Sequence, residues 1–290
     1  MSDLASPPAG GFDRRLTPAT ERVAHESLRG RIERPAYTAG RHARLSAALA
    51  DLCRAPDGAR DRQVNFGADL TVIDESGGWA FVQAHADGYC GWLRADALGP
   101  DDAPITHRLA SPATHLYPEP NMKLREIGSL SLGARLSLVE FRDGFARLAT
   151  GGWVPAQHVS DRPAPDPAEI ALSLIGTPYL WGGNSRFGID CSGLAQAALG
   201  ACGVACPGDS DMQRDAFAPV EGQIRRNDLL FWPGHVALAL DGAQMIHATA
   251  WRMSVIIEPI AAAIARIDAA EQGPFLGARR PSLVPDAAFP

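Results

Sequence analysis

The sequence predicts a multidomain protein in which two small all-β barrels are followed by one α+β domain. Three observations lead to this fold class. A pattern of short β-prone runs between glycine turns occurs twice, a proline-rich segment follows it, and a helical pattern ahead of several strands comes last. Helices grouped ahead of a mostly antiparallel sheet are typical of an α+β domain.

The repeat lies in the middle of the chain, and each copy contains the same order of glycines and aliphatic residues. The copies match in three segments, which pair residues 67–72 with 133–138, 78–82 with 144–148, and 91–93 with 152–154. Short strands separated by glycine turns indicate small antiparallel barrels, and two copies are too few for a solenoid. We therefore expect an N-terminal extension at 1–31, a first barrel at 32–99 and a second barrel at 100–162.

The segment Asp-Arg-Pro-Ala-Pro-Asp-Pro at 161–167 fits a semi-rigid spacer and opens the third domain, at 163–290. Asp166 can cap a helix that begins at Pro167 and ends at Gly176. A second helix is expected from about Cys191 to Cys202. Three strands should follow, at residues 228–232, 235–240 and 244–248.

Composition excludes several classes of partner. The net charge of −6 provides no basic surface for phosphates, so we expect no nucleic-acid partner. The most apolar run, 260–264, is too short to cross a bilayer, and the first residues lack the pattern of a signal peptide. We therefore expect a cytoplasmic, monomeric protein with no membrane partner. Cys202 and Cys206 have no paired Cys or His motif nearby, so no metal or cofactor is expected.

Cys191 is the candidate nucleophile. A glycine pair at 182–183 leads to Asp190-Cys191-Ser192-Gly193, which places the cysteine at the start of a helix. The free N–H groups and the dipole at a helix start favour a thiolate, so we expect a lowered thiol pKa. The same N–H groups could receive the oxyanion of a tetrahedral intermediate. As an alternative, Cys191 is a small residue that packs at a helix start.

Two histidines can serve this cysteine. His235 opens a predicted strand, and His247 closes the next one, with Asp241-Gly242 between them. A two-residue turn would put the two side chains on opposite faces, whereas a loop with an odd number of residues, centred on Asp241, would place them directly opposite each other. If both serve one site, the loop must be odd or bulged. His235 would then be the base, and His247 would orient its ring.

At these residues the sequence resembles the NlpC-type cysteine peptidases, papain-like enzymes of bacterial cell-wall metabolism. The matching segments cover most of residues 167–258 and occur in the family's order: 177–183, 190–194, 207–213, 227–229, 234–237 and 247–248. The repeats resemble the bacterial SH3-like domains that accompany such enzymes. The resemblance implies a catalytic triad of Cys191, His235 and His247. It also implies cleavage of the γ-D-glutamyl to diamino-acid bond in murein peptides.

The resemblance further implies a small substrate with a free N-terminal L-Ala, such as L-Ala-γ-D-Glu-diaminopimelate. Asp190 would pair with the substrate ammonium, and Tyr89 of the first barrel would enclose the alanine. The other implied substrate contacts are Ser192, Ser210, Trp181 and, near the oxyanion, Tyr179. For Tyr89 and Trp181 the competing interpretation is packing in a barrel or a core. The implied role is the recycling of murein peptides.

Two other functions remain open at the level of sequence. One is a different enzyme with the same catalytic plan, either an N-acetylmuramoyl-L-alanine amidase or an acyl transferase. The other is a catalytically inactive protein that binds the cell wall through its repeats. The first would accept blocked N-termini, and the second would leave Cys191 unreactive.

Overall fold

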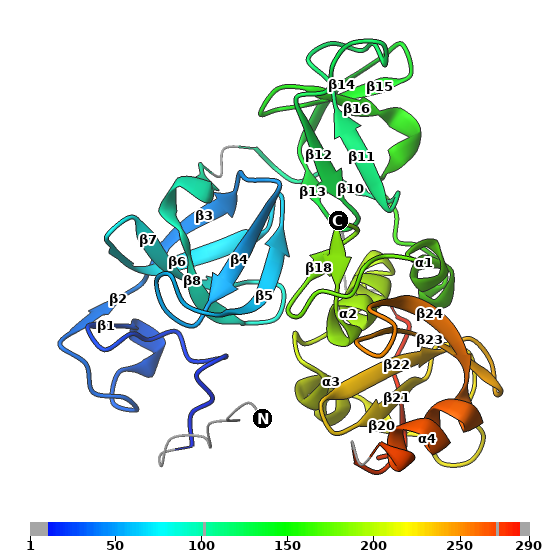
Figure 1. Ribbon diagram of the computed structural model, residues 1–290. Helices are drawn as coiled ribbons and strands as arrows, with labels where there is room; N and C mark the ends of the chain where they lie inside the picture. Colours follow the sequence, from blue (N-terminus) through cyan, green and yellow to red (C-terminus); the bar gives the residue numbers. More distant parts are fainter. Residues whose placement is uncertain (1–10, 101–102, 271–272, 285–290) are drawn as a thin grey trace. The chain divides into compact units, whose positions relative to one another are not determined.

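The computed structural model describes residues 11–100, 103–270 and 273–284 of the chain (Figure 1). Its contacts divide the chain into two compact units, Met1–Asp102 and Ala103–Pro290. Within the described residues, no helix is both long enough and apolar enough to span a bilayer.

The first unit contains one antiparallel sheet of short strands. Its seven-stranded sheet has the order β5-β4-β8-β7-β6-β3-β9, and β1 and β2 form a separate parallel pair. The strands are β1 (Val23–His25), β2 (Ala36–Thr38), β3 (Arg41–Leu45), β4 (Leu49–Cys53), β5 (Arg60–Asn65), β6 (Asp69–Ser76), β7 (Trp79–Ala84), β8 (Cys90–Arg94) and β9 (Leu98–Gly99). Two 3₁₀ helices, η1 (Glu26–Leu28) and η2 (Ala95–Ala97), complete it.

The segment before the first predicted barrel packs onto this sheet. The backbone N–H of Cys90 donates to the carbonyl of Arg15 at 2.6 Å. The side chains of Thr20 and Arg22 both bind the carboxylate of Asp74, at 2.8 and 2.7 Å. These contacts join part of the 1–31 segment to the strands that follow.

The second unit begins with a segment that repeats the strand pairing of the first unit. Its elements are β10 (His107–Leu109), β11 (Ala113–Leu116), β12 (Gly128–Ser131), β13 (Arg135–Leu136), β14 (Leu138–Arg142), β15 (Phe145–Leu148), β16 (Trp153–Pro155), η3 (Ala156–His158) and β17 (Val159–Ser160). β10 lies between β13 and β17, as β3 lies between β6 and β9. The pairs β11–β12 and β15–β16 likewise match β4–β5 and β7–β8. The repeat predicted from sequence is therefore present in the pairing of the strands.

The rest of the second unit is an α+β fold around a six-stranded antiparallel sheet, ordered β20-β25-β21-β22-β23-β24. Its strands are β20 (Ala218–Pro219), β21 (Leu229–Trp232), β22 (His235–Ala239), β23 (Gln244–Thr249), β24 (Ser254–Pro259) and β25 (Ala278–Arg280). A small hairpin joins β18 (Asn184–Ser185) to β19 (Gly188–Ile189). The helices are α1 (Pro167–Ser173), α2 (Cys191–Ala201), α3 (Ser210–Ala216) and α4 (Ile260–Ala269). The helices predicted after Asp166 and at Cys191, and the three predicted strands, are confirmed, but α1 ends at Ser173 and not at Gly176 as predicted.

Helices cover both faces of this sheet (Figure 1). Buried residues of α1 and α2 pack with Val236, Leu238 and Ile246 of the central strands. The buried side of α4 packs with the alternate residues, including Ala237, Ala239 and Met245. Because neighbouring side chains in a strand point to opposite faces, α2 and α4 lie on opposite sides of the sheet.

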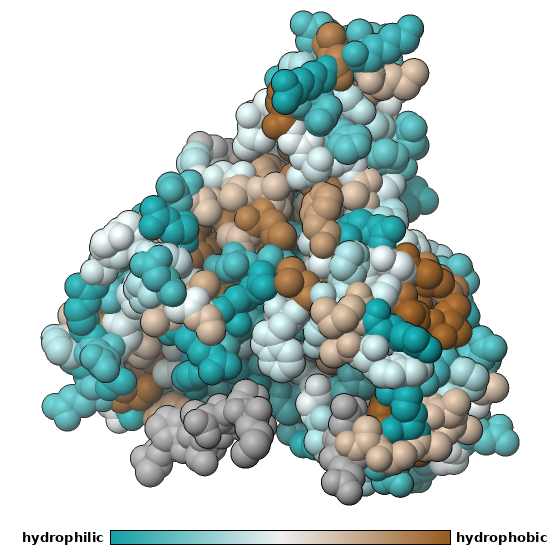
Figure 2. All heavy atoms as spheres, viewed as in Figure 1, coloured by the Kyte–Doolittle hydropathy of each residue, from teal (hydrophilic) through white to brown (hydrophobic). Residues whose placement is uncertain are grey.

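Apolar side chains gather at the surface near β24, where Figure 2 shows a hydrophobic patch. The exposed apolar residues of this strand and of the segments beside it include Ile175, Met253 and Ile257. The backbone N–H of Gly176 donates to Val255, which places Ile175 next to the strand. The neighbour of Ile257, Glu258, is buried and points to the other face, toward α4.

Candidate active site

Cys191 is the first residue of α2 and is 8% exposed. Asp190 caps the helix, because its Oδ1 accepts a hydrogen bond of 2.7 Å from the backbone N–H of Gly193. The cap leaves the first N–H groups of the helix directed at the space around the thiol. The predicted placement of Cys191 at a helix start is confirmed.

Two glycines allow the helix to reach this position. A β-carbon on Gly193 would lie 2.3 Å from the carbonyl oxygen of Gly183, and a β-carbon on Gly183 would lie 2.5 Å from that of Gly188. Gly182 has a φ of +70°, which most other residues rarely adopt. The glycines of the motif therefore let the loop and the start of the helix pack backbone to backbone.

The sulfur of Cys191 lies against the two residues that flank His235. Sγ is 4.0 Å from the carbonyl oxygen of Gly234, and the backbone N–H of Val236 is close enough to stabilise a thiolate. Pro233 and Gly234 form the tight turn between β21 and β22, with φ of +69° at the glycine. This turn presents the start of β22, and with it His235, to the sulfur.

The two histidines are joined by a hydrogen bond. Nε2 of His235 lies 2.9 Å from Nδ1 of His247, which leaves Nδ1 of His235 as the ring nitrogen that can face the thiol. Leu238 pairs with Ile246 and Ala239 with Met245, so the loop contains three residues, 241–243. The predicted odd loop is confirmed. Direct opposition is wrong, because in this register the histidines are offset by two residues, a diagonal arrangement that still keeps them on one face.

Burial determines the charge of all three groups. Burial lowers the pKa of His235 to about 3 and that of His247 to about 4. It raises the pKa of Cys191 to about 12, although the backbone N–H groups of Val236, Ser192 and Cys191 act in the opposite direction. The expected lowering of the thiol pKa is therefore wrong for the resting protein, because burial outweighs the helix start. At neutral pH the site holds a neutral thiol and two neutral imidazoles.

Three further side chains surround the histidines, and the sequence patterns pointed to none of them. The ring of Trp232 packs against His235, with centroids 5.7 Å apart. Oε2 of Glu258 lies 3.2 Å from Nε2 of His247. Arg266 of α4 binds both oxygens of Glu258, at 3.0 and 2.7 Å. A glutamate beside apolar strand residues gives no signal of such a contact until the register and the position of α4 are known.

Asp190 and Ser192 are linked to each other and to the glycine loop. Oγ of Ser192 donates to Oδ1 of Asp190 at 3.0 Å, and the N–H of Gly182 donates to Oδ2 at 2.8 Å. Burial raises the pKa of Asp190, although these hydrogen bonds and the one from Gly193 oppose the shift. The carboxylate thus has a structural role as a helix cap, and part of its side chain remains exposed. Its predicted contact with a substrate ammonium stays a prediction.

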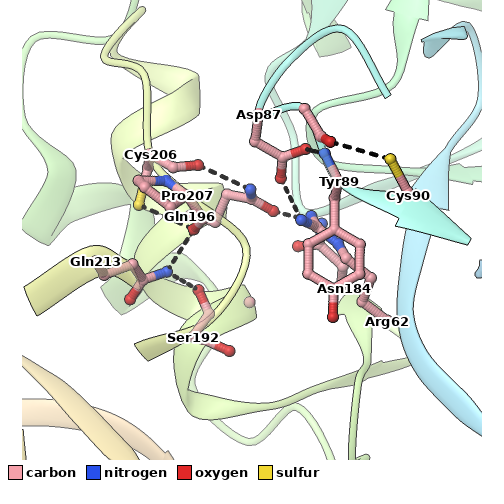
Figure 3. Close-up of polar contacts among 12 residues, drawn as sticks. Arg62, Asp87, Tyr89, Cys90, Asn184, Ser192, Gln196, Cys206, Pro207 and Gln213 are labelled. Carbon is pink, nitrogen blue, oxygen red and sulfur yellow. Dashed lines mark hydrogen bonds and ion pairs between the residues drawn. The ribbon is translucent and has the colours of Figure 1, made fainter. Parts of the chain in front are cut away.

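Gln213 ties α3 to the start of α2, as Figure 3 shows. It is fully buried, and its Nε2 donates to the carbonyl oxygens of Ser192 and Pro207 at 3.0 and 2.9 Å. Ser210 is the first residue of α3. The carbonyl of Ser192 is thereby held from the side of the segment that carries Ser210.

Tyr179 and Trp181 differ in their exposure. Burial raises the pKa of Tyr179, and the nearby Cys191 and Asp190 raise it further, so the phenol lies close to the thiol. The N–H of Tyr179 donates to the carbonyl of Met253 at 2.9 Å. Trp181 is 64% exposed, so the interpretation as a core residue is wrong for its side chain.

Tyr89 belongs to the first unit and is 1% exposed. Its N–H donates to Oδ1 of Asp87, and the guanidinium carbon of Arg62 lies 5.0 Å from the centre of its ring (Figure 3). Arg62 also forms an ion pair with Asp87. Both contacts are made by residues of the first unit, and a role in substrate binding stays a prediction.

Two protein families match parts of the chain. Residues 176–266 match the NlpC/P60 family, and residues 52–98 match the bacterial dipeptidyl-peptidase Sh3 domain. The first match contains Cys191, His235 and His247. The second contains β5 to β8 of the first unit.

Several known proteins are similar to a large part of the chain. A γ-D-glutamyl-L-lysine dipeptidyl-peptidase of Bacillus cereus is 26% identical over 69% of this chain and 70% of its own length. Dipeptidyl-peptidase 6 of Lysinibacillus sphaericus is 32% identical over 64% of this chain and 79% of its own length. The crystal structure of an NlpC/P60 family protein from Bacillus cereus has the same fold, with a TM-score of 0.71 at 24% identity over 83% of this chain and 99% of that protein. From these matches we conclude that the chain belongs to the NlpC/P60 family of peptidases, with a bacterial SH3 domain ahead of its peptidase domain.

Proposed function

We propose that the protein is a cysteine endopeptidase that cleaves the bond between γ-D-glutamate and a diamino acid in murein peptides. Its substrates would be small peptides with a free N-terminal L-Ala, such as L-Ala-γ-D-Glu-diaminopimelate. The Bacillus cereus relative, named γ-D-glutamyl-L-lysine dipeptidyl-peptidase, supports this choice of scissile bond. The identity of the diamino acid is part of the proposal.

One observation carries the proposal: the hydrogen bond between His235 and His247 beside the sulfur of Cys191. A buried cysteine needs no histidine pair for packing, and withdrawing the imidazoles of buried His247 and partly buried His235 from water is costly unless they bind each other or a third group. The His235–His247 distance of 2.9 Å and the position of Sγ at the residues flanking His235 provide a nucleophile, a base and a group that orients the base.

The reaction follows from the neutral resting state. As the substrate carbonyl approaches, the thiol proton moves to Nδ1 of His235, and the sulfur forms a bond to the γ-carbonyl carbon of D-Glu. The oxyanion lies near the backbone N–H of Cys191, and Tyr179 adds a hydroxyl close by. His235 then gives its proton to the leaving amine, and the C–N bond breaks. Water, deprotonated by His235, attacks the thioester and releases the acid and the thiol.

Recognition of a free N-terminus would fall to Asp190. A substrate ammonium needs a carboxylate that is partly shielded from water, and Asp190 is held in place by three donors of its own loop and helix. Ser192, Ser210 and Trp181 would complete the binding site in the second unit.

The proposal includes the biological setting. We infer a role in recycling murein peptides in the cytoplasm, by a monomer without metal or cofactor. The five cysteines, all of them described by the structure, form no disulfide, which fits a reducing compartment. We also infer that the repeated segment from β10 to β17 is a second SH3-like barrel, because its strand pairing matches that of the first unit.

The test is an assay on four tripeptides, with a free or an acetylated N-terminus and with lysine or diaminopimelate in third position. Release of L-Ala-D-Glu only from the peptides with a free N-terminus supports the proposal. Cys191→Ala should abolish turnover, with a loss of at least about a thousandfold, while the fold stays intact. Equal cleavage of the acetylated peptides would contradict the role given to the free N-terminus. If none of the peptides were cleaved, the proposed cleavage between γ-D-glutamate and the diamino acid would be contradicted.

A further inference from the structure

Glu258 is a buried carboxylate next to the histidine pair. It is 7% exposed, and its Oε2 lies 3.2 Å from Nε2 of His247. The register explains the contact: His247 pairs with Ile256, and Glu258 lies two residues further along β24 on the same face. Within the described part of the chain, Nε2 of His247 is buried and makes no hydrogen bond of regular geometry. Glu258 is thus the acceptor within ion-pair reach of this nitrogen.

Arg266 fixes the orientation and the charge of this carboxylate. Nε of Arg266 donates to Oε1 at 3.0 Å and Nη2 donates to Oε2 at 2.7 Å, a bidentate contact from α4 to β24. The guanidinium carbon also lies 4.2 Å from the ring centre of Trp251. A carboxylate held in this way is ionised, and an ionised carboxylate can only accept hydrogen bonds.

This restriction determines the protons of both imidazoles. Since Glu258 accepts, the proton of neutral His247 belongs on Nε2, and Nδ1 becomes an acceptor. Nδ1 of His247 then requires a proton on Nε2 of His235, which leaves the lone pair of His235 on Nδ1. We infer that Glu258 is a positioning residue that sets the tautomers of both histidines, so that the free lone pair of His235 faces the Cys191 thiol; this inference rests on the proposed function.

The charges around the histidines act in opposite directions. The carboxylate of Glu258 favours a positively charged imidazole, whereas Arg266, further along the same line, disfavours it. The carboxylate of Asp190 acts on the thiol of Cys191 and raises the pKa of that thiol. Loss of the negative charge of Glu258 should therefore reduce the fraction of thiolate–imidazolium pairs.

The test compares Glu258→Gln with Glu258→Ala. The Gln side chain keeps the size of Glu but carries an N–H₂ group. When this group faces Nε2 of His247, it favours the opposite tautomer of both rings. We expect Glu258→Gln to slow alkylation of Cys191 by iodoacetamide at pH 7 by at least about tenfold. Glu258→Ala should slow it less, although Ala leaves the larger hole. A merely structural role predicts the reverse order, and that order would overturn the inference.

Asp228→Asn is the matched control. Asp228 is also a fully buried carboxylate at the same sheet, bound at 2.7 Å through each oxygen by Arg280. Its loss should lower the melting temperature without changing the rate of alkylation or the pH dependence of that rate. The Cys191→Ala variant measures how much of the alkylation comes from the other four cysteines, so that this part can be subtracted. An equal effect of Asp228→Asn and Glu258→Gln on the rate would count against Glu258.

A measurement on the wild-type protein avoids the stability of variants altogether. Nitrogen-15 NMR of the histidine rings distinguishes Nε2–H from Nδ1–H. We expect both His235 and His247 to be protonated on Nε2, and a proton on Nδ1 of either ring would overturn the inference. Neither the spectrum nor the alkylation rate needs a substrate. A protein that passes both tests but cleaves no murein peptide would therefore refute the proposed substrate and leave the role of Glu258 intact.

Discussion

Gly193 packs against the carbonyl of Gly183 so closely that no side chain fits between them. The missing β-carbon would be 2.3 Å from that oxygen, which is part of the backbone and cannot move aside cheaply. Since Gly193 lies two residues after Cys191, the position of the thiol depends on this contact.

Gly193→Ala should therefore destabilise the peptidase domain by about 1–3 kcal/mol or more and reduce activity further by displacing Cys191. Urea denaturation and kcat/KM on the tripeptide measure the two effects. Gly200→Ala is the control in the same helix, because a β-carbon there has no neighbour within 4 Å. Alanine at this second position should stabilise the helix by up to about 1 kcal/mol. Equal effects of the two substitutions would contradict the argument.

The histidine pair predicts a graded series of variants. His235→Ala should reduce kcat by at least about a thousandfold, because it removes the group that carries the proton. His247→Ala should cost about a hundredfold and His247→Asn about tenfold, since an amide can still accept the hydrogen bond from His235. Steady-state kinetics gives each value, and His115→Ala, at a largely exposed histidine of β11, should be neutral. A His247→Ala variant as inactive as His235→Ala would make His247 more than an orienting group.

Asp190 offers a test that separates capping from recognition. Asp190→Asn keeps a good helix cap but removes the charge. We expect kcat/KM for the tripeptide with a free N-terminus to fall by about ten- to a hundredfold, and any slow cleavage of an acetylated peptide to stay unchanged.

Asp166→Asn is the matched control for that experiment. Asp166 caps α1, and its second oxygen also accepts a hydrogen bond of 2.8 Å, from Arg226. Both substitutions thus keep a capping side chain and remove the charge of a carboxylate whose second oxygen accepts one further hydrogen bond. If Asp166→Asn reduced cleavage of the free peptide as much as Asp190→Asn, the effect would be one of stability.

Acid should destabilise the protein through its buried histidines. In the unfolded chain His247 binds a proton near pH 6.5, whereas in the folded chain burial delays this to about pH 4. Between these values the unfolded state binds more protons, so stability falls as the pH falls, by up to about 1.4 kcal/mol per pH unit for each such histidine. Urea denaturation of wild type and His247→Asn from pH 7 to pH 4 measures the difference. Parallel curves over this window would contradict the shift.

Much of the fold follows from local sequence signals. The sequence Asp166-Pro167 predicts the start of α1, because a capping side chain and a proline in the first turn act within a few residues. The glycine turns likewise predict the repeated strand pairs. The position of Cys191 could also be predicted from the sequence, because it depends on a helix boundary. The placement of the two histidines on one face could be predicted because it depends on the alternation of side chains along a strand.

Other features depend on contacts between distant segments. Parity alone could not separate direct opposition of His235 and His247 from the observed offset of two residues, because both registers put the rings on one face. The thiol pKa depends on how deeply Cys191 is buried under its neighbours. Glu258 becomes part of the site through the register of β24 beside His247, and Arg266, which holds its carboxylate, comes from the packing of α4.

The strand β25 lies inside the sheet, between β20 and β21, although it comes from the far end of the described chain. Arg280 of this strand binds Asp228, and Ala278 pairs with Leu230. During synthesis, the backbone groups of β21 that pair with β25 therefore stay unpaired until the ribosome has translated past residue 280. A messenger RNA cut short before that point would yield a chain with an exposed strand edge, a template for aggregation.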